Sequence, residues 1–158
     1  MRLQDDAGRL GYAGLLPFAA CALLVWLSPS LVPVRFAYAW LEWTFTYAAL
    51  ILSFMAGTRW GLVLAAGGRD APFSGLLLTT IPSLMAWVAA VPDRLIGVQL
   101  GYTPRVAVLA AGFALVLADD LRGVRAGEAP AWYASLRKRL TFWVLLSLGF
   151  VLMRIWVA

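Results

Sequence analysis

The sequence predicts an all-α membrane protein, a bundle of about five transmembrane helices with a short interfacial helix before the last. The chain is 63% hydrophobic with a mean hydropathy of +0.83, and only 13% of its 158 residues are charged. A soluble domain carries about 25% charged residues. Several apolar runs reach the roughly 17–25 residues that span a bilayer, and in lipid only a helix satisfies their backbone. No linker divides the chain, so residues 1–158 should form a single polytopic membrane domain.

The first two predicted spans cover about residues 10–27 and 39–66. We expect the first span to remain in the mature chain, because Asp5, Asp6 and the long apolar run do not fit a signal peptide. The second span ends at Gly67-Gly68, where a glycine pair favours a turn.

The last three predicted spans cover about residues 73–91, 102–118 and 141–157. The fourth span stops at Asp119-Asp120, because charged residues are costly inside a bilayer. Pro82 lies inside the third span and removes one helical hydrogen bond. We expect a structural kink there rather than the broken helix of a transporter site.

The distribution of basic residues predicts the orientation. The longest loop, 119–140, is rich in arginine and should therefore face the cytoplasm. Five spans then place the N-terminus in the cytoplasm and the C-terminus in the periplasm. Arg2, Arg9, Arg69, Arg122, Arg125, Arg137, Lys138 and Arg139 would lie inside, and Arg35, Arg94, Arg105 and Arg154 outside.

Several classes of chemistry are not expected. Histidine is absent and Cys21 is the one cysteine, which excludes His-ligated haem, His-based zinc sites and Ser-His or Cys-His catalysis. Asp119 and Asp120 diverge by about 100° on a helix, so they cannot flank one bond as an acid–base pair. We predict no enzyme, no catalytic residue, no metal and no cofactor. The net charge of +5 reflects cytoplasmic loops, and we expect no nucleic-acid partner.

A stripe of small residues runs along the second span. Such residues recur at every fourth position, which is about 400° on a helix, so they form one slowly drifting face. Small side chains let another helix approach closely. The partner helix can come from this chain or from another subunit. The predicted helix-packing residues are Ala49, Ser53, Gly57, Gly61 and Ala65.

Arg59 lies within the inner half of the second span, where an unpaired charge is costly. Asp119 ends the fourth span on the same side, so we predict an intramembrane Arg59–Asp119 charge pair. Glu42 lies at the opposite side of the membrane and is a poor partner for Arg59. Snorkelling of the side chain to water or lipid phosphate is one alternative. A bound substrate or cofactor anion is the other, in a possible ligand pocket formed by Arg59, Trp60, Pro82, Ser83 and Trp87.

The segment 130–140 reads as the interfacial helix. Pro130 suits a first helical turn, and Leu136 and Leu140 share a face with an aromatic residue. Basic residues bordering that face would lie at the headgroup phosphates. These basic residues would fix the orientation of the chain in the membrane. Alternatively, they would form a specific site for an anionic lipid or a partner. The predicted headgroup contacts are Trp132, Tyr133, Arg137, Lys138 and Arg139.

An ordered set of short motifs resembles the domain-of-unknown-function 3429 family, which has mitochondrial and bacterial inner-membrane members. The resemblance implies about five helices and brings no established activity and no catalytic residues. The bias towards arginine, alanine and glycine favours a bacterial source, so we expect the bacterial inner (cytoplasmic) membrane. The matching pieces are Leu16-Pro17-Phe18, the run from Tyr47 to Gly57, Trp60-Gly61, the run from Ile81 to Trp87, Gly112-Phe113 through Asp119, Pro130-Ala131-Trp132-Tyr133, Leu136-Arg137 and Leu140-Thr141.

We therefore expect a non-catalytic inner-membrane protein that is an accessory or assembly subunit of a larger membrane complex. By location, respiratory and photosynthetic complexes are the natural hosts. Its partners would be membrane lipids and other membrane-protein subunits or a second copy. The alternative is an intramembrane binder or carrier of a lipid, pigment or quinone near Arg59. A cavity reaching Arg59 would favour the binder, whereas a packed Arg59–Asp119 pair with an exposed glycine stripe would favour the subunit.

Overall fold

The computed structural model describes residues 3–67, 73–91 and 101–157. These residues form helices and no strand, which confirms the predicted fold class. In chain order the helices are α1 (Leu3–Ala13), α2 (Leu16–Trp26), α3 (Val34–Gly67), α4 (Phe73–Ala90), α5 (Tyr102–Arg125) and α6 (Ala131–Val157).

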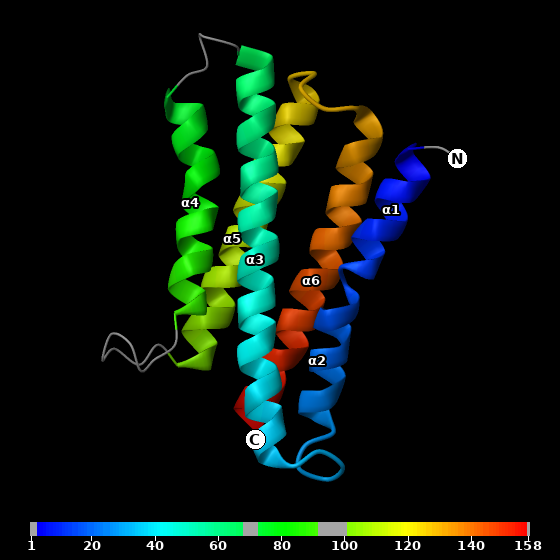
Figure 1. The fold of residues 1–158 in the computed structure, drawn as a ribbon, viewed down its shortest axis with the longest axis vertical. Helices are drawn as coiled ribbons and strands as arrows, with labels where there is room; N and C mark the ends of the chain where they lie inside the picture. Colours follow the sequence, from blue (N-terminus) through cyan, green and yellow to red (C-terminus); the bar gives the residue numbers. More distant parts are fainter. Residues whose placement is uncertain (1–2, 68–72, 92–100, 158) are drawn as a thin grey trace.

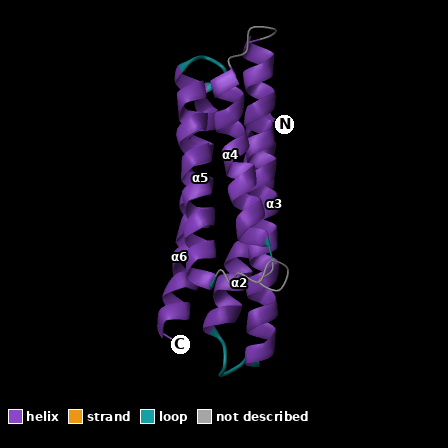
Figure 2. Cartoon of the chain, turned by 90° about the vertical axis from the view of Figure 1, so that its left-hand side faces the viewer, coloured by secondary structure: helices purple, strands orange, loops and turns teal. Residues whose placement is uncertain are grey.

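The helices run along one long axis, and the chain ends lie at opposite ends of the bundle (Figure 1). We call these the N end and the C end. The N end holds the starts of α1, α4 and α6 and the ends of α3 and α5. In the orthogonal view the bundle remains long and narrow (Figure 2). Helix α5 packs against α3, α4 and α6, and α2 packs against α3 and α6.

The chain crosses the membrane several times. Within the described residues, four segments are long and apolar enough to do so: Gln4–Trp26, Val34–Ala66, Phe73–Ala90 and Ala131–Val157. The first of these contains both α1 and α2. The fifth long helix, α5, runs beside them and has charged residues at both ends of its apolar stretch.

Three boundaries differ from the sequence prediction. The first span breaks after Ala13, and α2 restarts with Pro17 in its first turn, the position that tolerates proline. Helix α5 continues through Asp119-Asp120 to Arg125, because partners on neighbouring helices neutralise both carboxylates. The separate interfacial helix is a wrong prediction, since α6 is continuous from Ala131 to Val157 and contains no proline. The predicted end at Gly68 lies outside the described residues.

The core lies where α2, α3, α5 and α6 meet. Its fully buried members are large apolar side chains such as Phe45, Leu52 and Phe113. Close packing of α3 on α5 depends on Gly112, because a Cβ atom there would lie 2.5 Å from Leu52 Cδ2. The core thus holds α5 firmly against α3 in the middle of the membrane.

Candidate functional site

Two layers of paired charge cross the bundle, one near each end. The N-end layer contains Arg59, Arg137 and three carboxylates, and the C-end layer contains Glu42 and Arg105. Along α3, Glu42 and Arg59 are about 25 Å apart at about 1.5 Å per residue. The hydrocarbon core is about 30 Å thick. The separation of the two layers is therefore slightly less than the thickness of the hydrocarbon core.

Arg59 is held by two carboxylates. Its Nε atom lies 2.6 Å from Asp119 Oδ2, and its Nη1 atom lies 2.6 Å from Glu128 Oε2. The guanidinium packs against Gly123, where any side chain would collide with it. Only 5% of Arg59 is exposed. The structure thus brings the predicted pair together and removes any need for snorkelling.

Glu128 was not predicted to contact Arg59. It follows α5 in a turn that Gly127 makes possible, because Gly127 has φ +80°, a conformation that favours glycine. The backbone nitrogen of Glu128 donates to Gly123 O at 2.9 Å. This turn folds the chain back over the end of α5 and places the second carboxylate on Arg59. The glycine after a basic helix end was the available signal in the sequence.

Arg137 forms the second ion pair of the N-end layer. Its Nε atom lies 2.5 Å from Asp120 Oδ2, and the two residues are only 3% and 2% exposed. The prediction that Arg137 lies among lipid headgroups is therefore wrong. Its position on α6 faces α5, so it is drawn to the carboxylate rather than to water. Lys138 and Arg139, on other faces of α6, are exposed, and their contact with headgroups remains a prediction.

The C-end layer is centred on Arg105, which is 1% exposed. Its Nη1 and Nη2 atoms lie 2.6 and 2.9 Å from the two carboxylate oxygens of Glu42. Its Nε atom donates to Ala89 O at 2.8 Å, and its guanidinium lies 4.3 Å from the Phe45 ring centre. This one side chain therefore ties α3, α4 and α5 together. From the sequence, Arg105 was counted only as one of the cations on the outer side of the membrane.

The predicted ligand pocket around Arg59 does not form. Trp60 and Trp87 are 45% and 66% exposed, whereas Pro82 is buried. None of the five predicted residues lines the apolar cavity described below. Since two guanidinium groups face three carboxylates in the N-end layer, this layer also has no spare positive charge for an anion.

The stripe of small residues on α3 becomes exposed towards the N end of the bundle. Ala49 is buried and Ser53 half-buried, but Gly57, Gly61 and Ala65 are exposed. A Cβ atom at Gly57 or Gly61 would meet nothing within 4 Å. Each step of four residues turns the stripe by about 40°, which carries it from α5 to the outer surface. No described helix of this chain packs on the two glycines.

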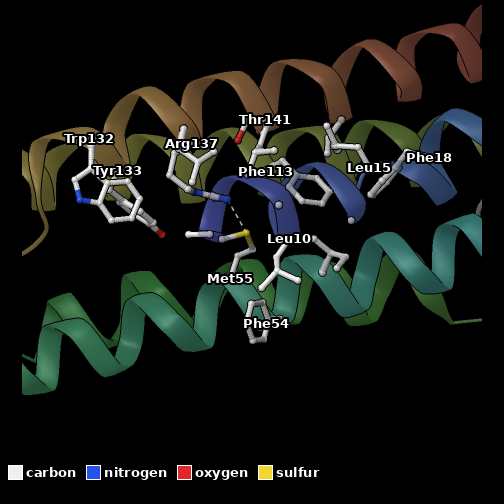
Figure 3. Close-up of a pocket in the computed structure, with 17 residues that line it drawn as sticks. Leu10, Leu15, Phe18, Phe54, Met55, Phe113, Trp132, Tyr133, Arg137 and Thr141 are labelled. Carbon is white, nitrogen blue, oxygen red and sulfur yellow. Dashed lines mark hydrogen bonds between the residues drawn. The ribbon is translucent and has the colours of Figure 1, made fainter. Parts of the chain in front are cut away.

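A cavity of about 330 Å³ lies between α3, α1 and α6 (Figure 3). Its walls are almost entirely apolar, with Phe18, Phe54 and Phe113 among them. Trp132 and Tyr133 line its N end, and their contact with headgroups remains a prediction. Sequence analysis missed this cavity, because its walls come from five helices that are distant in the chain.

Comparison with known proteins gives a family match over most of the chain. Residues 4–153 match a family profile described as protein of unknown function, DUF3429. The chain is 31% identical over 141 residues to transmembrane protein 69 of Xenopus tropicalis, covering 88% of the chain and 50% of the relative. It is 30% identical over 128 residues to transmembrane protein 69 of Mus musculus, covering 79% and 46%. The chain thus spans about half the length of these curated relatives. No solved structure gives a significant match.

Proposed function

The chain belongs to the DUF3429 family, and from this premise we propose that it is a non-catalytic accessory or assembly subunit of a larger membrane complex. It docks through the N-end half of α3. The observation that carries this proposal is the open face at Gly57 and Gly61, where a Cβ atom would meet nothing within 4 Å. Small residues at a helix surface let a second transmembrane helix approach closely.

The buried charged side chains are paired within the chain, which supports a role in packing against other proteins. All four buried charged residues of the described part, namely Arg59, Arg105, Asp120 and Arg137, take part in ion pairs. These charges are therefore neutralised within the bundle and need no substrate to balance them. Arg59 points into the bundle while the neighbouring glycines face outward, so a partner can cover the glycine face without disturbing the ion pairs.

The proposed location is the bacterial inner membrane, with the N end in the cytoplasm. Exposed basic side chains gather at the N end, where Arg9, Arg122, Arg125, Lys138 and Arg139 are exposed. At the C end Arg105 is buried and neutralised by Glu42, which leaves Arg35 and Arg154 as the other described cations there. Basic residues favour the cytoplasmic side. Respiratory and photosynthetic complexes are the hosts that this location suggests.

The test is purification from the native membrane in a gentle detergent, followed by a native gel and mass spectrometry of comigrating proteins. The wild-type chain should migrate with a defined larger complex. The double variant Gly57→Leu, Gly61→Leu should migrate alone, because leucine prevents close approach. Gly149→Leu is the matched control, since Gly149 is also an exposed helical glycine with open space around it. Migration of the wild type as a monomer would overturn the proposal.

A further inference from the structure

We propose that the cavity between α1, α3 and α6 binds a neutral amphiphile, whose carbonyl oxygen accepts hydrogen bonds from Arg137 and Thr141. The cavity measures about 330 Å³, within the range of roughly 300–1,000 Å³ typical of small-molecule sites. Such sites combine an apolar lining with a few placed polar groups. The cavity has this composition, because Arg137 and Thr141 are set into walls of leucine, phenylalanine and other apolar side chains (Figure 3).

Two buried polar atoms in the cavity wall lack a hydrogen-bond partner. They are Arg137 Nη2 and Thr141 Oγ1, in residues that are 3% and 2% exposed. The remaining nitrogens of Arg137 are occupied, since Nε pairs with Asp120 and Nη1 contacts Met55 Sδ. The two residues are one helical turn apart on α6, so their free groups lie on the same face. Buried polar groups are normally satisfied, and a ligand would satisfy both.

The hydroxyl of Thr141 behaves differently from those of four other helical threonines. Thr44, Thr46 and Thr58 of α3 each donate to the carbonyl four residues earlier. Thr80 of α4 does the same. Thr141 makes no such bond among the described residues. Its hydroxyl is therefore available to a group inside the cavity.

The charge balance around the cavity selects a neutral head group. Asp120 neutralises Arg137 at 2.5 Å, and Asp119 and Glu128 neutralise Arg59. This layer contains three carboxylates and two guanidinium groups, so it has no net positive charge that would bind an anion. A guanidinium N–H can only donate, so the ligand atom must be an acceptor. A carbonyl oxygen has two lone pairs and can accept from both Arg137 and Thr141.

The cavity is reachable from the lipid. Leu10 of α1 and Phe54 of α3 both line it, yet they are 75% and 69% exposed. Helix α1 packs mainly on α6, where Gly11 lies against Leu140. The side of the cavity facing α3 therefore meets the membrane between Leu10 and Phe54 (Figure 3). A ligand with an apolar tail can enter here and leave its tail in the bilayer. An isoprenoid quinone and the acyl ester of a glycerolipid both have this chemistry.

The test measures binding to the purified full-length protein in detergent. The probes are decylubiquinone and dioleoylglycerol, each titrated and followed by quenching or by competition, with oleate as the anionic comparison. Thr141→Val keeps the shape and removes the hydroxyl, so it should weaken binding of the preferred probe roughly three- to tenfold, the effect of one hydrogen bond. Thr58→Val is the matched control and should bind as the wild type does, because Thr58 does not line the cavity and its hydroxyl already donates to Phe54 O.

A second variant tests the cavity itself. Ala7→Phe fills it from the wall of α1 and should abolish binding of either neutral probe. Preference for decylubiquinone or for dioleoylglycerol then identifies the source of the carbonyl. Equal affinities of Thr141→Val and wild type for both neutral probes would overturn the proposal. So would tighter binding of oleate than of the neutral probes, or undiminished binding by Ala7→Phe.

Discussion

Breaking the Arg137–Asp120 pair from one side should destabilise the bundle much more than removing both partners. The pair has an N···O distance of 2.5 Å and is 3% and 2% exposed. Two unit charges about 4 Å apart attract by about 4 kcal/mol at an effective dielectric of about 20. Removing one partner of a buried pair costs about 3–5 kcal/mol, because the other charge stays buried alone. We therefore expect Arg137→Met or Asp120→Leu to lower the free energy of unfolding by about 3–5 kcal/mol.

The double variant Arg137→Met, Asp120→Leu should lie within about 1 kcal/mol of the wild type, because apolar residues can replace a buried ion pair at little cost. The assay is reversible unfolding by sodium dodecyl sulfate in mixed micelles, followed by circular dichroism. Lys138→Met is the control on the same helix, and as an exposed substitution it should change stability by less than about 0.5 kcal/mol. Additive losses in the double variant would refute the reasoning.

Two further predictions use the same unfolding assay. Gly112→Ala should destabilise the bundle by about 1–3 kcal/mol, the usual cost of overpacking, because the new Cβ would lie 2.5 Å from Leu52 Cδ2. Gly57→Ala is the control and should be neutral or stabilising, because Gly57 has open space around it. Equal effects of the two substitutions on stability would contradict the packing described. Tyr47→Phe should cost about 1 kcal/mol, since the hydroxyl donates to Gly14 O at 2.9 Å between α1 and α2. Amide exchange should then speed up around Gly14, and unchanged exchange there would count against this bond.

Much of the fold could be predicted because a bilayer imposes a strong pattern on sequence. Apolar runs long enough to cross it locate the helices, and the depth of a charge limits its partners. That reasoning paired Arg59 with Asp119, which the structure places 2.6 Å apart. It rested on depth alone, so it required no knowledge of which helices are neighbours.

The other ion pairs could not be predicted in this way. Arg105 and Asp120 were assigned to span ends, where water normally solvates a charge. Both are nearly fully buried, because neighbouring helices cover them. Arg137 was assigned to a surface helix for the same reason. The sequence pattern records the polarity of a residue, but the direction it faces depends on how α5 and α6 are rotated about their axes.

The charged ends of α5 have a consequence for how the chain enters the membrane during synthesis. The uncharged stretch of α5, residues 106–118, is about 20 Å long, whereas the hydrocarbon core is about 30 Å thick. Isolated in lipid, this segment would draw Arg105 and Asp119 into an environment that disfavours charge. Helix α3 carries the complementary Glu42 and Arg59 and leaves the ribosome earlier. We therefore expect α5 to enter the bilayer only while α3 is still beside it. The two ionic layers would then determine the order in which the helices insert, in addition to joining them in the folded bundle.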